Sequence, residues 1–196
     1  MKDLKYFEEK LNVLNKEFAE FKNNVRKSPE IGGVIEIAGM KWKVLEKVEK
    51  GFFCILDGFE SLTTEFDADT NDWKASDLRN HLNVDFKNKI EEAIGEELIE
   101  FRRDLLSLDG QTEYGDCVDK VSLLNVDEYR KYRKMLPNTD KWWWLCTPWS
   151  TPCNGYKWAT AVVSTSGDIY YVDYDCRGGV RPFCIFPSSI FESEEE

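Results

Sequence analysis

Residues 142–186 read WWWLCTPWSTPCNGYKWATAVVSTSGDIYYVDYDCRGGVRPFCIF, and five of the seven tryptophans of the chain lie in this stretch. Apolar runs alternate here with turn-forming residues, which is typical of short strands. The expected strands cover residues 142–146, 159–163, 168–172 and 180–186. Their expected core residues are Trp143, Leu145, Val162, Val180 and Phe183, and Arg181 is expected to tie the last strand to a carboxylate or to carbonyls.

The chain before this stretch predicts a mixture of strands and helices. In order, we expect a hairpin over residues 33–45, a strand over 52–56, a loop over 58–75, helices over 77–82 and 85–101, a strand over 120–124 and a helix over 126–135. Ser76 is the expected N-cap of the first of these helices. Strands and helices do not alternate regularly, so the pattern favours an α+β domain with an antiparallel sheet and two to three helices.

Residues 4–25 carry apolar side chains at alternating steps of three and four. This seam consists of Leu4, Phe7, Leu11, Leu14, Phe18, Phe21 and Val25. It predicts a coiled-coil-like helix over residues 1–28, ended by Ser28-Pro29. Such a helix either folds onto its own domain or joins copies of the chain. The narrow stripe favours a homo-oligomer, with a trimer preferred. The compact domain is expected over 31–186, followed by an acidic tail over 187–196.

Charge and composition exclude several classes of protein. The formal net charge of −11 disfavours a nucleic-acid partner, because phosphate backbones would be repelled. No run approaches the roughly 18 apolar residues of a membrane span, so membrane insertion is not expected. The opening MKDLKYFEEK carries charges where a signal peptide needs apolar residues. The expected location is therefore cytoplasmic or virion-associated.

The chain lacks the usual catalytic and metal-binding patterns. Its single histidine, His81, lies near Leu78 and Leu82 on an expected helix and is predicted to pack there. The six cysteines show no C-x-x-C spacing, which disfavours a zinc site and favours free, mostly buried thiols. No nucleophile elbow and no phosphate-binding glycine loop occurs. We therefore expect no enzyme activity, no cofactor and no metal.

Two polar windows interrupt the aromatic stretch, over residues 150–156 and 173–178. Tyrosine and tryptophan mixed with small polar residues are typical of binding surfaces. Ordinary surface loops are the alternative interpretation. The candidate ligand-binding residues are Trp149, Ser150, Thr151, Cys153, Asn154, Tyr156, Trp158, Tyr170, Tyr171, Asp173, Tyr174, Asp175, Cys176 and Arg177.

Residues 31–186 resemble the C-type-lectin-like domains of phage and bacterial proteins, which are related to the formylglycine-generating-enzyme fold. The resemblance rests on an ordered set of short motifs: Trp143-Trp144-Leu145 with Pro148, Ala161-Val162-Val163, Ser166-Gly167-Asp168 and Gly179-Val180-Arg181-Pro182. Upstream, Asp77-Leu78-Arg79, Leu82-Asn83 and Asp119-Lys120-Val121 match as well. Cys146, Thr147 and Phe183 depart from the usual residues of the pattern.

The resemblance implies a ligand-binding scaffold. In some of these domains the binding face is diversified by a retroelement that acts on adenines, which gives many residue types but not Trp, Met, Lys, Gln or Glu. Both polar windows lack all five. The triplets that hold calcium and sugar in lectins are absent, so that chemistry is not implied.

These observations favour a non-enzymatic ligand-binding or display module of phage or prophage origin, with a protein or cell-surface ligand. The alternative is an acidic inhibitor of a host nucleic-acid-binding enzyme that imitates phosphate charge. An enzyme is the third hypothesis, and it would need a pocket with convergent titratable groups.

Overall fold

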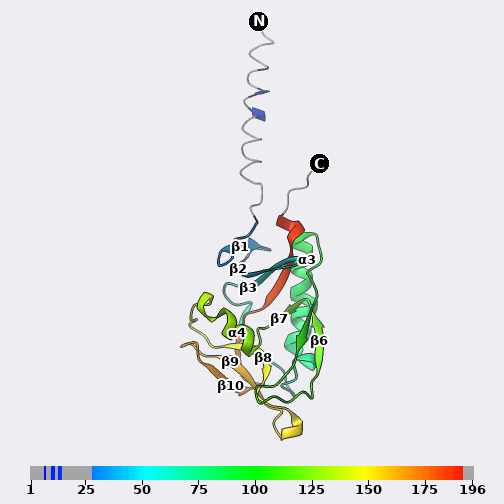
Figure 1. Cartoon of the computed structure of the whole chain (residues 1–196), viewed down its shortest axis with the longest axis vertical. Coiled ribbons are helices and arrows are strands. Elements are labelled where there is room, and N and C mark those ends of the chain that lie inside the picture. The colour runs from blue at the N-terminus through cyan, green and yellow to red at the C-terminus, as the bar shows by residue number, and fades with distance from the viewer. Residues whose placement is uncertain (1–6, 8–9, 12, 15–27, 192–196) are drawn as a thin grey trace.

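The computed structural model describes residues 7, 10, 11, 13, 14 and 28–191 (Figure 1). Within the expected N-terminal helix, Phe7, Leu11 and Leu14 are helical and exposed. The other seam residues, Leu4, Phe18, Phe21 and Val25, lie outside the described residues, as do residues 192–196 of the expected tail.

The first of two five-stranded sheets joins the two ends of the domain. Its strands are, in order across the sheet, β1 (Val34–Ile37), β2 (Met40–Val48), β3 (Gly51–Leu56), β12 (Phe183–Pro187) and β7 (Val121–Ser122). All of its neighbouring strands are antiparallel. The early hairpin and the last strand therefore pair within one sheet.

The second sheet carries the aromatic stretch. Its order is β10 (Ile169–Asp173), β9 (Ala159–Val163), β8 (Trp143–Pro148), β11 (Gly178–Val180) and β4 (Ser61–Thr64). The pairing of β8 with β11 is parallel, which corrects the expectation of a purely antiparallel sheet. A separate two-stranded ribbon joins β5 (Phe101–Asp104) and β6 (Asp116–Asp119).

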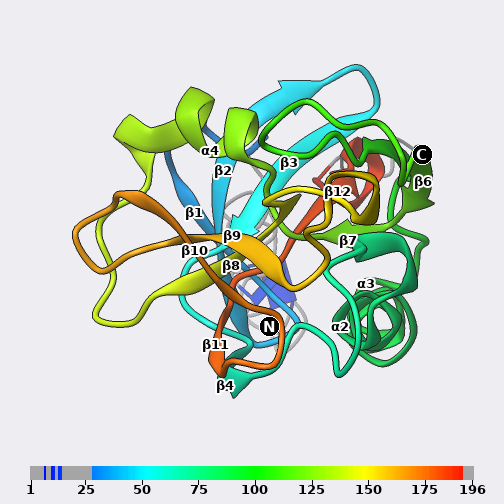
Figure 2. The same cartoon turned by 90° about the horizontal axis from the view of Figure 1, so that it is seen from below.

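Helices lie on opposite sides of β3. Its residues Phe52, Cys54 and Leu56 face one apolar cluster, and Phe53 and Ile55 face another. The first cluster includes residues of α2 (Asp77–His81), the π-helical turn η2 (Leu82–Phe86) and α3 (Lys87–Ile94), and the second includes residues of α4 (Val126–Tyr132). Figure 2 shows α4 and the α2–α3 pair on opposite sides of the molecule. The five core residues expected in the aromatic stretch are all buried, as predicted.

Local chemistry explains several helix boundaries. Ser76 caps α2 as expected, because its hydroxyl accepts the backbone N–H of Arg79 at 3.2 Å. The expected helix over residues 85–101 instead ends at Gly95, whose φ of 72° is the left-handed conformation that closes a helix. Asn125 and Glu128 form a capping box at the start of α4.

Three other expectations are corrected. The expected loop over 58–75 contains β4 and the short 3₁₀ helix η1 (Trp73–Ala75). The expected strand over 180–186 is interrupted at Arg181 and Pro182, and the chain passes there from the second sheet into the first. The domain also extends past residue 186, because Ile190 is buried in the 3₁₀ helix η5 (Ser188–Phe191). Among the described residues, no helix has the length and hydrophobicity needed to span a bilayer.

Candidate functional site

Both polar windows lie at the open end of the β9–β10 hairpin. The first window precedes β9 and the second follows β10, and these two strands pair in register from Ala159 opposite Asp173. The hairpin continues one step into the loops, because Tyr174 donates its backbone N–H to the Trp158 carbonyl at 2.8 Å. Two windows that are separated in the sequence are thus brought together at one end of this hairpin.

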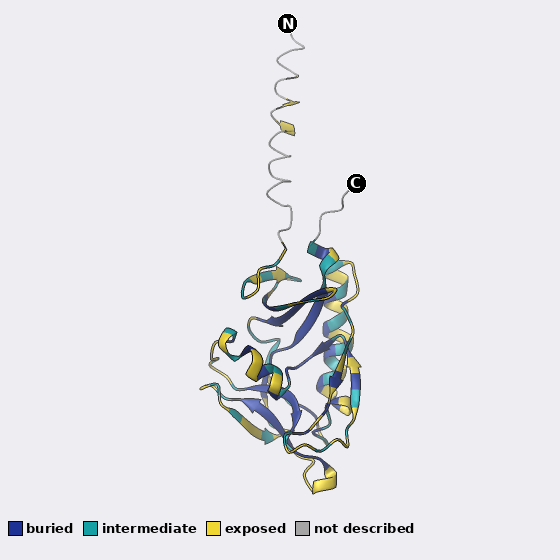
Figure 3. Ribbon diagram, in the orientation of Figure 1, coloured by how far each residue is buried: buried dark blue, intermediate teal, exposed yellow. Residues whose placement is uncertain are grey.

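This end of the molecule lies far from the end where residues 28 and 191 are found. Figure 1 shows the 3₁₀ helix η4 (Pro152–Asn154) of the first window at one end and β1 and η5 at the other. Figure 3 shows that η4 is exposed, whereas the strands behind it are largely buried.

Five aromatic side chains form the aromatic end, defined as Trp149, Tyr156, Trp158, Tyr170 and Tyr171. They make two groups. The Tyr171 ring lies 4.2 Å from Trp149 and 5.2 Å from Tyr170, and the Tyr156 and Trp158 rings lie 4.9 Å apart (centroid distances). Within the described chain, no ring contact joins the two groups.

The rings of the aromatic end are available to a partner. Tyr156, Trp158, Tyr170 and Tyr171 are 44%, 43%, 60% and 41% exposed, and Trp149 is half-buried. Large aromatic side chains in contact with solvent on a well-packed scaffold are characteristic of interaction sites.

The second window alternates between outward and inward residues. Asp173, Asp175 and Arg177 are exposed, whereas Tyr174 and Cys176 are half-buried and pack against the core. These residues form a turn after β10, in which the Cys176 N–H donates to the Asp173 carbonyl at 3.0 Å. Tyr174 and Cys176 were candidate contact residues, and the structure places them partly beneath the surface.

The first window is held from below by the β5–β6 connection. Ser150 and Thr151 are buried, although both were candidates for the contact face. The Asp109 carboxylate accepts hydrogen bonds from the Ser150 hydroxyl at 2.6 Å and from the Asn154 amide at 3.0 Å. Hydrogen bonds from Ser107 and Ser150 lower the pKa of Asp109, so this carboxylate is charged at neutral pH. Hydrogen bonds to Asp109 thus hold the first window in place, and Ser150 and Thr151 form its buried part.

Sequence reasoning missed Asn71, which fixes both ends of the first window. Its buried side-chain amide donates to the Ser150 carbonyl at 3.0 Å and to the Ala159 carbonyl at 2.7 Å. Its oxygen accepts the Tyr114 hydroxyl at 2.6 Å, and burial raises the pKa of Tyr114 to about 12. The acidic stretch around Asn71 was predicted to be loop, and no local pattern indicated a buried amide within it.

The cysteines are free, as expected, and four of the six are buried. Cys153 is exposed, and its backbone N–H donates to Glu113 at 2.9 Å. A hydrogen bond with Glu113 raises the pKa of the Cys153 thiol, and burial raises that of the half-buried Cys176. Raised pKa values make both thiols weaker nucleophiles.

Within the described residues, no group of His, Cys, Asp and Glu side chains is placed to hold a metal ion.

His81 does not pack in the core as expected. Its ring is part-exposed, with Nε2 3.1 Å from Glu60 Oε1 and Nδ1 3.4 Å from Asp85 Oδ2. The residues near it in the sequence suggested an apolar face, but the ring lies on the polar side of the helical turn.

Arg181 is structural, as predicted. It is buried, its Nε donates to the Leu56 carbonyl at 2.9 Å, and its Nη2 lies 3.8 Å from Asp57 Oδ1.

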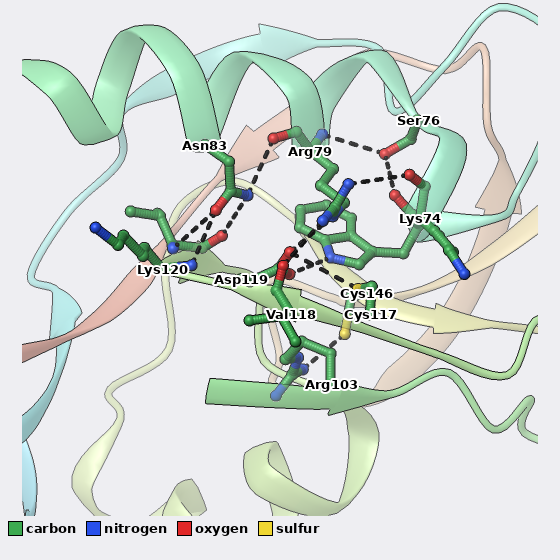
Figure 4. A network of polar contacts seen from close by, with 12 residues as sticks. Lys74, Ser76, Arg79, Asn83, Arg103, Cys117, Val118, Asp119, Lys120 and Cys146 are labelled. Carbon is green, nitrogen blue, oxygen red and sulfur yellow. Dashed lines mark hydrogen bonds and ion pairs between the residues drawn. The ribbon is translucent and has the colours of Figure 1, made fainter. Parts of the chain in front are cut away.

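A buried polar network connects segments that are distant in the sequence (Figure 4). The Asp119 carboxylate accepts the Trp73 indole N–H at 2.8 Å and Arg79 Nε at 2.7 Å. Asn83 donates to the Val121 carbonyl at 2.8 Å and accepts the Lys120 N–H at 3.0 Å. These contacts connect the α2–η2 helical segment to the β6–β7 region. The upstream motifs that carry the resemblance thus include residues that hold the scaffold together.

A cavity of about 400 Å³ lies away from the aromatic end, beside β1, the end of α3 and η5. Apart from Glu36 its lining is apolar, and the lining includes no histidine or cysteine. It therefore offers no convergent titratable groups for acid–base chemistry.

Comparison of the chain with family models, with curated proteins and with solved structures found no match.

Proposed function

We propose that this protein is a non-enzymatic binding module of phage or prophage origin, built on a C-type-lectin-like scaffold. Its aromatic end and the polar residues beside it contact a protein or cell-surface ligand. The observation that carries the proposal is the grouping of four exposed aromatic rings and a half-buried fifth on β10 and on the loops beside the β9–β10 hairpin. Rigid rings lose little conformational entropy on binding and bury a large apolar area.

The first strand β1 and the last strand β12 belong to one sheet, which supports the C-type-lectin-like scaffold, because the first and last described elements, β1 and η5, then lie at the end opposite the loops. An experimental structure tests the scaffold directly. A chain path in which β12 does not pair with β3 would contradict it.

The binding face is tested by selecting peptides from a displayed random library on the immobilised full-length chain. Trp158→Ala and Tyr171→Ala are each expected to weaken the selected peptides by about tenfold, as for contact aromatics at interfaces. Val118→Ala is the matched control, because Val118 is an exposed apolar side chain on β6, outside the hairpin. Equal losses for all three variants, or none at all, would contradict the proposal.

A charge mimic of phosphate is the competing function. It predicts that binding falls steeply with salt and depends little on the aromatic rings. A salt titration of the same peptides, repeated with Tyr171→Ala, separates the two functions.

Retroelement diversification of the loops is a further part of the proposal. The structure limits the positions at which variation would be tolerated to exposed ones, such as Asn154, Tyr156, Asp173, Asp175 and Arg177. Buried Ser150 and Thr151 would tolerate less variation. The gene sequence tests this part: diversified positions require codons that end in C or T, and other codons there would exclude it.

The N-terminal segment is proposed to join copies of the chain into a trimer. Leu11 and Leu14 are helical and 58% and 62% exposed in the single chain, as expected for a seam that meets other copies. Light scattering of the full-length chain tests this part, and a trimer gives a mass three times 22.9 kDa.

A further inference from the structure

The charge around the aromatic end indicates which ligand chemistry it can accept. Residues 149–178 contain two basic side chains, Lys157 and Arg177. Arg177 Nε forms an ion pair with Glu65 Oε1 at 2.9 Å. Lys157 is the second of the two basic residues in this stretch. Exposed carboxylates surround the same region, from Asp109 and Glu113 below the first window and from Asp173 and Asp175 in the second.

Asp173 and Asp175 are in an unusual position. Both are exposed, and within the described chain neither has an ion pair or a side-chain hydrogen bond. Asp173 ends β10, and Asp175 lies in the turn that follows, in which the Cys176 N–H donates to the Asp173 carbonyl at 3.0 Å. Two unpaired like charges on one short turn repel each other, and a cation bound near both would relieve that repulsion.

The rings next to these carboxylates also favour a cation. Tyr171 and Asp173 lie on the same face of β10, because side chains alternate along a strand. The Tyr170 and Tyr171 rings are stacked with an interplanar angle of 16°, and Tyr170 is 60% exposed. The face of an aromatic ring attracts ammonium and guanidinium groups, and Arg and Lys stems also pack on apolar rings.

We propose that the aromatic end recognises a protein segment rich in arginine or lysine, whose cationic groups stack on Tyr170 and Tyr171 and pair with Asp173 and Asp175. This inference rests on the proposed function, because it names the ligand chemistry of the same face. The electrostatics disfavour the competing ligand classes: phosphorylated or carboxylated surfaces would meet like charge, and a neutral saccharide would leave the two carboxylates unpaired.

The test uses three short fluorescent peptides that alternate glycine with arginine, with citrulline or with glutamate. Citrulline keeps the shape of arginine but removes its charge. Fluorescence anisotropy with the full-length chain is expected to show binding of the arginine peptide, about tenfold weaker binding of the citrulline peptide and none of the glutamate peptide.

Variants separate a specific site from general attraction to an acidic protein. The double variant Asp173→Asn/Asp175→Asn is expected to weaken the arginine peptide by about tenfold, and Tyr171→Ala by about fivefold. The matched control is Glu36→Gln/Glu92→Gln, which changes the net charge equally at two exposed positions on β1 and α3. It is expected to change the affinity by less than about twofold. Unchanged circular dichroism and urea midpoints show that each variant is folded.

Two outcomes would overturn the inference. Equal losses for the two double variants would mean that net charge alone attracts the peptide. Equal binding of the arginine and citrulline peptides, both weakened by Tyr171→Ala, would mean that the aromatic end binds but does not select cations. The second outcome leaves the proposed function intact. The proposed function fails separately, if library-selected peptides are insensitive to Trp158→Ala and Tyr171→Ala.

Discussion

Asn71 is the residue on which the shape of the first window depends most. A single buried amide satisfies two carbonyls and one hydroxyl that belong to separate segments. Removing it takes one hydrogen-bond partner from each of the three groups, and each lost partner costs about 1 kcal/mol.

Asn71→Ala is therefore expected to lower the free energy of unfolding by about 2–4 kcal/mol, measured by urea denaturation. Tyr114→Phe removes one of the three hydrogen bonds and is expected to cost about 1 kcal/mol. Asn138→Ala is the control, because Asn138 is exposed and also bonds a carbonyl, that of Ser166, at 2.9 Å. If Asn71→Ala and Asn138→Ala cost the same, Asn71 does not fix the window.

Glu91 and Lys120 give a prediction about pH. Burial alone would raise the pKa of Glu91, but hydrogen bonds from Lys120 Nζ and from the Leu98 N–H, both 3.0 Å, outweigh it and lower the pKa below 4.5. A depressed pKa in the folded state stabilises the protein above pH 4.5, and this contribution is lost as the pH falls through the folded-state pKa.

Glu91→Gln is expected to reduce stability at pH 7 and to flatten its decline between about pH 5 and pH 3. Lys120→Met is expected to flatten the same decline in stability, because it removes the hydrogen bond that Lys120 Nζ donates to Glu91. Urea midpoints measured across this range provide the test, and a Glu91→Gln curve parallel to that of the wild type would contradict it.

At the residue scale, sequence composition identified exposed rings better than it identified exposed polar residues. Tyr156, Trp158, Tyr170 and Tyr171 are exposed as expected, because each lies in or beside a polar turn. Ser150 and Thr151 are buried, and the partners of Ser150, Asp109 in the β5–β6 connection and Asn71, are far away in the sequence. Spacing along the chain carries no information about such distant contacts.

At the element scale, the register of β3 with β12 depends on a glycine. Gly51 lies opposite Pro187, and a Cβ at this position would be 2.1 Å from the Phe186 carbonyl oxygen. The neighbouring atom is backbone, so the clash can be relieved only by separating two strands at the centre of the first sheet.

Gly51→Ala is accordingly expected to destabilise the protein by about 3 kcal/mol or to prevent folding, whereas Gly39→Ala should cost about 1 kcal/mol. Gly39 lies in the β1–β2 turn with a φ of 69° and has no atom within 4 Å of the added Cβ, so it measures backbone strain alone. Thermal unfolding of both variants tests this. Similar melting temperatures would show that the strands adjust more easily than the structure implies.

The type of a secondary-structure element was easier to predict than the residues at which it begins and ends. The hairpin at Gly39, the strand β9 and the helix α4 with its capping box follow from period and turn chemistry, which are local. The strands β4, β5 and β6 were not predicted, because these short segments lack clear apolar alternation and their pairing partners are distant or weakly patterned. The change of sheet at Pro182 is likewise a tertiary feature, although the missing N–H of proline explains why the strand breaks there.

At the scale of the whole molecule, the described domain separates its two ends by role. The first and last described elements, β1 and η5, lie at one end of the domain, and η4 beside the aromatic end lies at the other (Figure 1). If residues 1–28 join three copies, the three aromatic ends point away from the junction and can bind one surface together. Linked sites gain avidity without new contacts, by about 10² to 10⁴ in apparent affinity.

The double variant Leu11→Glu/Leu14→Glu is expected to convert the oligomer to a monomer, because it places charges within the apolar seam. Binding to a surface densely coated with the arginine peptide should then fall by about a hundredfold, whereas binding to the same peptide free in solution should be unchanged. Surface plasmon resonance and anisotropy measure the two quantities. Lys10→Glu is the control, because it changes charge on the same helix outside the seam. The seam does not join the copies as proposed if the Leu11→Glu/Leu14→Glu variant remains an oligomer. The same holds if its affinity falls equally for the peptide-coated surface and for the free peptide.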